Sequence, residues 1–227
     1  MSSAQLAFTD LLKHLRPTLA ESGFRREGRN FVCETLSCWI IVNFQRSHLN
    51  SGDQVSFTIN LAIASKRVLA YEGRPTDIPP AFNTAHWEER IGYFLSGQKD
   101  KWWTLTDVSS LGIVESEVRH ALVELAVPKL LGGSSEQGLC ELLGIVTFRP
   151  WEYRQLKIRS ILLAQGRRFD ELPKVFQRMR ELALGRPWQS LAEGDIDEIK
   201  KRFSLPMEAG SPKSEAVVEP TLANRID

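Results

Sequence analysis

The sequence lacks several features that would assign it to a broad class at once. Its 227 residues contain no run of about 18 apolar residues, so no membrane-spanning helix is expected. Residues 1–17 show no basic segment followed by an apolar stretch, which argues against a secretory signal. The 3 cysteines are too few for a disulfide framework, and their odd number fits reduced thiols. These absences favour a protein of the cytoplasm that makes no contact with a membrane.

Signatures of catalysis are also missing. There is no phosphate-binding Walker loop, no dinucleotide fingerprint, no nucleophile elbow and no zincin motif. Cys33 and Cys38 flank a predicted hairpin turn, where two buried thiols are favoured over a disulfide, and a zinc site would need two further ligands at paired spacing. We therefore predict no catalytic residue, no metal and no cofactor. Whether the protein is an enzyme stays open, with a preference for a non-enzyme.

Short stretches in the first half of the chain alternate apolar and polar residues, which is typical of half-buried strands. Val55, Phe57 and Ile59 share one face of such a stretch, while Ser56 and Thr58 share the other. A sheet of this kind buries its aliphatic face against helices and presents amides and hydroxyls on the opposite face. We predict antiparallel strands at residues 30–34, 38–47, 54–65, 87–95 and 101–105.

Helical periodicity marks the start of the chain and its middle. Apolar residues recur at steps of three and four up to Leu19, with a kink expected at Pro17 and a helix end near Ser22, capped by Gly23. A long helix with Ser116 as its N-cap is expected within residues 112–133. Shorter helices are expected at residues 66–72 and 134–144.

Beyond residue 148 the pattern is helical throughout. Helices at 152–165 and 169–184 form a predicted hairpin, and a third begins at Asp195. Residues 204–227 are short of large apolar side chains and are predicted to be disordered. The fold class is α+β: an antiparallel sheet of about five strands packed on one face by helices, followed by an α-helical hairpin and a disordered C-terminal tail. The expected units are residues 1–148, 149–203 and 204–227.

Several of these stretches together resemble a known bacterial family. They are GFRREGRNF at 23–31, IIVNFQRS at 40–47, FTINLAIAS at 57–65, RIGYFL at 90–95 and DKWWTL at 100–105. Their order and spacing resemble the domain-of-unknown-function family 4304, over roughly residues 5–145. The resemblance implies little about activity, because that family has no settled function.

The candidate binding surface is the polar face of the predicted sheet. Adjacent strand residues point to opposite faces, so one of the paired tryptophans at 102 and 103 should enter the core while the other walls a surface. Amides, a hydroxyl and a guanidinium on that face orient a polar ligand or form a solvated network, and both interpretations stay open. The candidate contact residues are Trp39, Asn43, Gln45, Thr58, Asn60, Arg90, Trp102 and Trp103.

These features predict a non-catalytic binding or protein-interaction module that uses the open face of the sheet. An exposed patch around Trp39 and Ile41 would fit an unknown protein partner or a second copy of the chain. The alternative is a small-molecule-binding or enzymatic domain with a polar pocket around Arg90, Asn60 and Gln45. An immunity-type protein that neutralises a bacterial toxin is a further alternative, by analogy with compact α+β proteins.

Nucleic-acid binding is the last alternative. Residues 149–203 carry 13 basic against 8 acidic residues, and such a surface attracts phosphate backbones. The basic positions fall around several helix faces, however, where arginine stems pack and pair with nearby carboxylates. The formal net charge of +1 is too small to attract a polyanion over a long range. We therefore do not favour nucleic acid as the partner.

Overall fold

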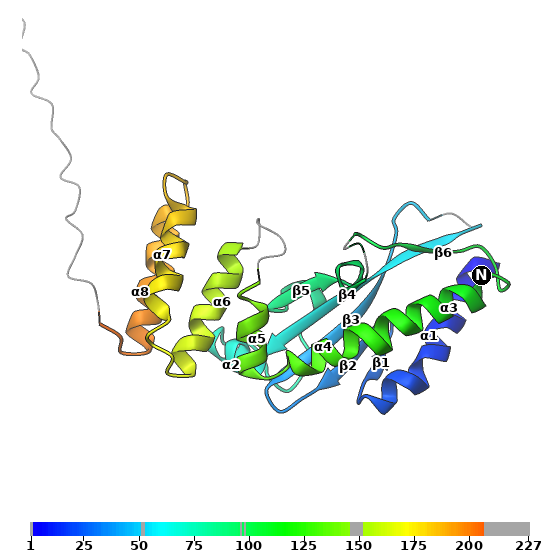
Figure 1. Ribbon diagram of the computed structural model, residues 1–227, viewed down its shortest axis with the longest axis horizontal. Coiled ribbons are helices and arrows are strands. Elements are labelled where there is room, and N and C mark those ends of the chain that lie inside the picture. The colour runs from blue at the N-terminus through cyan, green and yellow to red at the C-terminus, as the bar shows by residue number, and fades with distance from the viewer. Residues whose placement is uncertain (1, 51–52, 96, 98, 146–151, 207–227) are drawn as a thin grey trace, which may run out of the picture.

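The computed structural model describes residues 2–50, 53–95, 97, 99–145 and 152–206. It confirms the α+β fold and an antiparallel sheet, in the order β1-β2-β3-β4-β5 with β6 paired to β4 (Figure 1). The predicted tail falls outside the described residues from 207 onward. The strands are β1 (Arg25–Glu27), β2 (Asn30–Glu34), β3 (Cys38–Arg46), β4 (Val55–Ser65), β5 (Trp87–Arg90) and β6 (Trp103–Leu105).

The two central strands follow the predicted alternation. β3 and β4 pair from Cys38 opposite Ser65 to Arg46 opposite Phe57. Because side chains alternate along each strand, this register places most of the large apolar residues of both strands on one face, whereas Trp39 and Ile41 lie on the other. Phe44 and Ile59 are opposite each other on that face, and both are fully buried.

Two helical stretches cover this first face in one layer, as Figure 1 shows. Helix α1 (Ser3–Glu21) runs through Pro17 and ends as predicted, with Ser22 as C-cap and Gly23 at a φ of 85°. Its Phe8 ring packs 5.2 Å from that of Phe57 on β4. The second stretch packs beside α1 and consists of α3 (Leu111–Arg119), a π-helical segment (His120–Ala126) and α4 (Val127–Gly132). Ser116 lies inside α3, so its prediction as an N-cap is wrong: Ser110 is the cap residue.

The π-helical segment has a local cause. Pro128 has no N–H and its ring would crowd the carbonyl of residue 124 in a regular α-helix. The chain responds by widening one turn, in which the Val127 N–H donates to the carbonyl of Leu122. The helix thereby passes a proline without ending.

The second face of the sheet is half covered, which differs from the open face that was predicted. Helix α2 (Lys66–Tyr71) and the proline-rich stretch that follows it fold back across one half of this face. Trp39 Nε1 donates to the carbonyl oxygen of Thr76 at 3.0 Å, and Leu69 and Ala85 pack into the same cluster. Prolines end regular structure but still allow an apolar loop to cover a sheet.

The outer strands also differ from expectation. β1 was not predicted, and it pairs with β2 through a tight turn in which Gly28 has a φ of 63°. The strand predicted at 87–95 ends at Arg90 and continues as a 3-10 helix (Ile91–Phe94). There, Gly92 allows the backbone of Lys99 to approach so closely that a Cβ would lie 2.0 Å from its carbonyl oxygen. Chain reversal at this contact shortens β5.

The remaining helices extend from one end of the sheet (Figure 1). They are α5 (Glu136–Leu142), α6 (Glu152–Gln165), α7 (Leu172–Ala183) and α8 (Gln189–Arg202), with α6 and α7 forming the predicted hairpin. Asp195 is not a cap, as was predicted: it is buried within α8 and accepts hydrogen bonds from Lys157 Nζ at 2.6 Å and Tyr153 Oη at 2.7 Å. One apolar cluster runs from α1 to α8. No helix among the described residues is long and apolar enough to cross a membrane.

Candidate functional site

The half of the second sheet face that α2 does not cover carries a polar row that crosses four strands. Asn30, Asn43, Asn60 and Arg90 are directly opposite one another on β2, β3, β4 and β5. Because cross-strand partners point to the same side of a sheet, their side chains share one surface. The row therefore brings together three of the residues predicted as contacts from distant parts of the sequence.

The amides of this row bond mainly to one another. Asn43 Nδ2 donates to Asn30 Oδ1 at 2.7 Å, while Asn60 Nδ2 donates to Gln45 Oε1 at 2.8 Å and to Asn43 Oδ1 at 3.1 Å. Thr58 is fully buried and donates its hydroxyl to the Lys101 carbonyl oxygen at 2.7 Å. Such bonds satisfy the polar groups within the protein, which matches a network that these residues satisfy among themselves more closely than a ligand site.

An accessible cluster closes the row at the β5 edge. Arg90 Nη1 lies 2.5 Å from Asp100 Oδ2, and Trp102 Nε1 donates to the same oxygen at 3.0 Å. The Arg90 guanidinium carbon is 5.4 Å from the Trp102 ring centroid, within range of a cation–π contact. Trp102 is 38% exposed and is therefore the outward member of the tryptophan pair.

Two of the three tryptophans predicted as contact residues are inaccessible. Trp103 is buried, stacks on Phe57 with ring centroids 5.7 Å apart, and donates from Nε1 to Glu117 Oε2 at 3.0 Å. Trp39 is buried beneath the stretch that follows α2, and so is Ile41. The prediction of an exposed apolar patch around Trp39 and Ile41 is therefore wrong, because the second face is half covered.

Many basic residues of the C-terminal helices are engaged in ion pairs. Arg154 reaches Glu88 on β5 at 3.2 Å, which ties α6 to the sheet. Burial raises the pKa of Glu88, and the Arg154 hydrogen bond opposes this shift. Further pairs join Lys157 to Asp195, Arg178 to Glu152 and Arg180 to Glu193. These pairs break up the basic stripe that the sequence suggested for nucleic acid.

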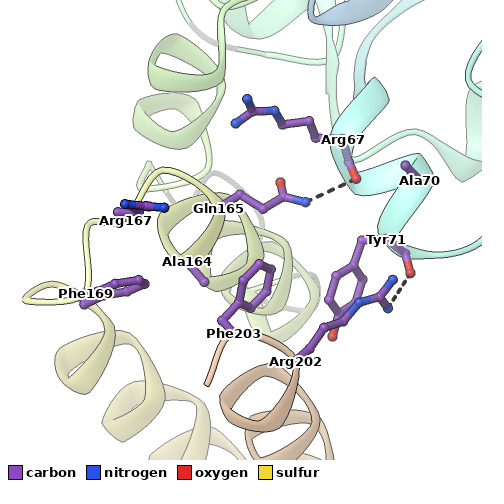
Figure 2. A pocket seen from close by; sticks show the side chains of 9 residues that line it. All are labelled: Arg67, Ala70, Tyr71, Ala164, Gln165, Arg167, Phe169, Arg202 and Phe203. Atoms are coloured by element: carbon purple, nitrogen blue, oxygen red, sulfur yellow. Dashed lines mark hydrogen bonds between the residues drawn. The ribbon is translucent and has the colours of Figure 1, made fainter. Parts of the chain in front are cut away.

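A second candidate site, which the sequence did not predict, lies where α2, α6 and α8 meet. It is an open hollow of about 750 Å³, called the arginine hollow below, and Figure 2 shows its lining. Three segments far apart in the chain form its wall: the outer face of α2, the end of α6 with the turn after it, and the end of α8. The lining residues are Arg67, Ala70, Tyr71, Ala164, Gln165, Arg167, Phe169, Arg202 and Phe203.

The three arginines of the hollow differ in how they are held. Arg67 Nη1 is 2.8 Å from Glu136 Oε2, and Arg202 Nη1 donates to the Tyr71 carbonyl oxygen at 2.8 Å. Arg167, in contrast, has no carboxylate partner within the part of the chain that the structure describes, and it is exposed. Its guanidinium is therefore the most available charge in the hollow.

Aromatic rings form the rest of the wall. Tyr71 stacks on Phe203 with centroids 6.1 Å apart and an interplanar angle of 8°, and the Arg202 guanidinium carbon is 4.0 Å from the Tyr71 centroid. The Tyr71 hydroxyl donates to Glu198 Oε1 at 3.1 Å. Burial, and then the Glu198 carboxylate, raise the pKa of Tyr71 to about 12, so the phenol stays neutral near neutral pH. Phe169 is 43% exposed at the rim.

Two unfavourable features are concentrated at this hollow. Arg167 has a φ of 57°, in the left-handed region where side chains are disfavoured. It follows α6 at the position that glycine usually takes, since its N–H donates to Ala164 O at 3.1 Å and the next N–H donates to Leu163 O at 2.9 Å. Gln165 Nε2 donates to the Arg67 carbonyl oxygen at 3.3 Å, which leaves Gln165 Oε1 buried without a partner. Such features cluster at functional sites.

The buried histidine serves structure rather than chemistry. His86 Nδ1 accepts a hydrogen bond from the Ser65 N–H at 2.8 Å, and its Nε2 lies 3.4 Å from Glu72 Oε2. Burial lowers the pKa of His86, so the ring is held neutral. Within the described residues, no group of three histidine, cysteine, aspartate or glutamate side chains is arranged to hold a metal ion.

The sequence holds a weak signal for the arginine hollow. Each of its three segments places an arginine close to an aromatic residue: Arg67 with Tyr71, Arg167 with Phe169, and Arg202 with Phe203. Such pairs are common in helical proteins, and only the fold shows that these three converge. Arg167 is one of the basic residues weighed above for nucleic-acid binding, and nothing in the sequence joins it to Arg67 or Arg202.

Comparison with known proteins places the chain in a family. Neither the curated proteins nor the solved structures gave a match. The family model described as "Domain of unknown function (DUF4304)" matches residues 15–131, which include the whole sheet and α2 with its hollow-lining Arg67 and Tyr71. Helices α6 to α8, which complete the hollow, lie beyond the matched residues. The chain belongs to the DUF4304 family.

Proposed function

We propose that this protein is a non-catalytic binding protein that holds a small anionic ligand in the arginine hollow. The observation that carries the proposal is that three arginines, from three separate segments, line one hollow of about 750 Å³. Guanidinium groups recognise carboxylates and phosphates through parallel N–H donors, and the volume falls in the range of ligand pockets.

The charges at the hollow leave Arg167 as the principal ligand-binding group. Helices α2, α6 and α8 all end here, and helix C-termini carry partial negative charge that attracts cations. Arg202 donates a hydrogen bond to the Tyr71 carbonyl oxygen, at the C-terminus of α2, and Arg67 is paired with Glu136. The helix termini and the Glu136 carboxylate offset part of the positive charge, and Arg167 is the arginine of the hollow that has no carboxylate partner among the described residues.

The non-catalytic part of the proposal is supported by the state of His86, which has one ring nitrogen bonded to the backbone and the other facing Glu72. A general base needs a free nitrogen directed at a substrate. We place the protein in the cytoplasm, since Cys33, Cys38 and Cys140 are free and buried.

Nuclear magnetic resonance with inorganic pyrophosphate as the probe tests this function. In the ¹H–¹⁵N spectrum, the side-chain Nε–Hε signal of Arg167 and the backbone signals of residues 164–169 are expected to shift on titration. The variant Arg167→Ala should weaken binding at least tenfold, because a hydrogen bond to a charged group contributes about 1.5–3 kcal/mol.

Arg16→Ala is the matched control, since Arg16 is an exposed arginine of α1, outside the hollow lining. It should bind pyrophosphate as the wild type does. The proposal fails if pyrophosphate leaves the hollow signals unmoved, or if Arg167→Ala and Arg16→Ala bind equally well.

The exposed cluster at the sheet edge supports a second candidate function, a protein-interaction surface. Trp102 and Arg90 are in contact there, and tryptophan and arginine are the residue types most enriched at binding hot spots. We propose a protein partner for this cluster, since its exposed indole lies beside the Arg90–Asp100 pair at the β5 edge of the sheet.

Site-specific photo-crosslinking tests the second candidate. A photoreactive residue in place of Trp102 should capture a discrete partner in the native host, and the added change Arg90→Ala should abolish that capture. A photoreactive residue in place of the exposed Arg16 is the control for random collisions. Capture that does not depend on Arg90 would contradict the candidate.

A further inference from the structure

The aromatic side chains of the arginine hollow narrow its ligand class. Figure 2 shows Phe169 and Phe203 on opposite sides of Ala164, and Gln165 and Arg167 lie between Ala164 and Phe169 along the chain. Phe203 is supported from behind by its stack on Tyr71, whereas Phe169 exposes 43% of its surface. A small alanine between two phenyl rings leaves room for a flat group, and the exposed ring gains by being covered.

Charge and aromatic surface are close together on one short turn. Arg167 and Phe169 are two residues apart, and the hydrogen bonds that end α6 fix the backbone of Arg167. A ligand that binds both must carry an anionic group close to a planar ring. Arg202 lies against Tyr71 across the hollow and adds a second guanidinium to the wall.

We infer that the ligand of the arginine hollow is a nucleoside monophosphate, whose base packs against Phe169 and whose phosphate is bound by Arg167. This inference rests on the proposed anion-binding function and names its ligand class. A phosphate monoester fits better than an aromatic carboxylate, because its greater charge and additional oxygens can engage more than one guanidinium. Stacking of the base on an aromatic side chain supplies the rest of the affinity and does not require hydrogen bonds that identify the base.

Calorimetric titration with four probes tests the inference on the full chain. AMP is expected to bind at least tenfold more tightly than inorganic pyrophosphate, than adenosine and than benzoate, because each of these lacks either the ring or the phosphate. The variant Phe169→Ala should weaken AMP binding about tenfold, as loss of one base stack does, and leave pyrophosphate binding unchanged.

Tyr93→Ala is the matched control, since Tyr93 is an aromatic residue of similar exposure (44%) outside the hollow lining. It should bind AMP as the wild type does. If AMP binds no better than pyrophosphate, or Phe169→Ala has no effect on AMP, the ligand class is wrong while the anion-binding function stands. If benzoate equals AMP, the assignment of a phosphate is overturned. If neither AMP nor pyrophosphate binds, both proposals fail.

Discussion

At the scale of single residues, Arg167 combines an unfavourable backbone with an available charge. A side chain in the left-handed conformation costs about 1–2 kcal/mol relative to glycine, and glycine is the residue that most often ends a helix in this way. The structure records a φ of 57° there and no carboxylate partner among the described residues. Arginine at this position lowers stability relative to glycine. Such a residue is expected where its side chain binds a ligand.

The variant Arg167→Gly should therefore be more stable but unable to bind the anion. We expect its free energy of unfolding, measured with urea, to rise by about 1 kcal/mol after allowance for the entropy of glycine. Ser204→Gly is the control, because Ser204 has a φ of 53° and does not line the hollow. It should gain similar stability and keep pyrophosphate binding. A loss of stability in Arg167→Gly would show that the arginine supports the fold.

At the scale of elements, the periodicity of apolar residues predicted the segments that have a regular pattern and missed those that do not. The alternation in residues 38–65 was sufficient for β3 and β4, and adjacent tryptophans had to face opposite ways. Which of them entered the core depended on β6 pairing with β4, where Trp103 opposes Phe57. β1 was missed because three residues are too few to show alternation. The stretch after α2 that covers Trp39 was missed because its prolines prevent a regular pattern of apolar residues.

The buried histidine of that cover gives the element-scale prediction. Burial lowers the pKa of His86 from its ordinary 6.5, so the unfolded chain binds more protons than the folded one just below this pH. Stability should therefore fall as the pH drops from about 6.5, until the lower folded pKa is passed. His86→Asn keeps an acceptor for the Ser65 N–H and should flatten this part of the profile.

Urea unfolding between pH 7 and pH 5 measures the effect, with the wild type and His86→Asn compared at each pH. The Glu72 pKa is lowered through its bonds to His86 and Arg74 despite its burial, so its own loss of stability comes at lower pH, below 4.5. The two groups therefore act in separate windows. Parallel profiles for the two proteins would rule out His86 as the source of the slope.

At the scale of the whole molecule, the arginine hollow joins the DUF4304 segment to the C-terminal helices. Its wall combines α2, inside the matched residues 15–131, with α6 and α8 outside them. The Tyr71–Glu198 and Arg202–Tyr71 bonds cross this boundary, and one apolar cluster is continuous across it. The site was beyond sequence prediction because it exists only where three distant segments meet. A ligand bound there should stabilise both parts together.

Thermal unfolding tests this coupling, given the inferred nucleotide ligand. At a concentration of AMP about 100 times its dissociation constant, binding adds about 2.7 kcal/mol to the folded state. For a chain of this size that corresponds to a rise in Tm of about 5–10 °C in a single transition. Arg167→Ala should lose most of the rise, whereas Arg16→Ala should retain it. Two separate transitions, with only one raised by AMP, would show instead that the helices and the sheet unfold independently and that the hollow does not couple them.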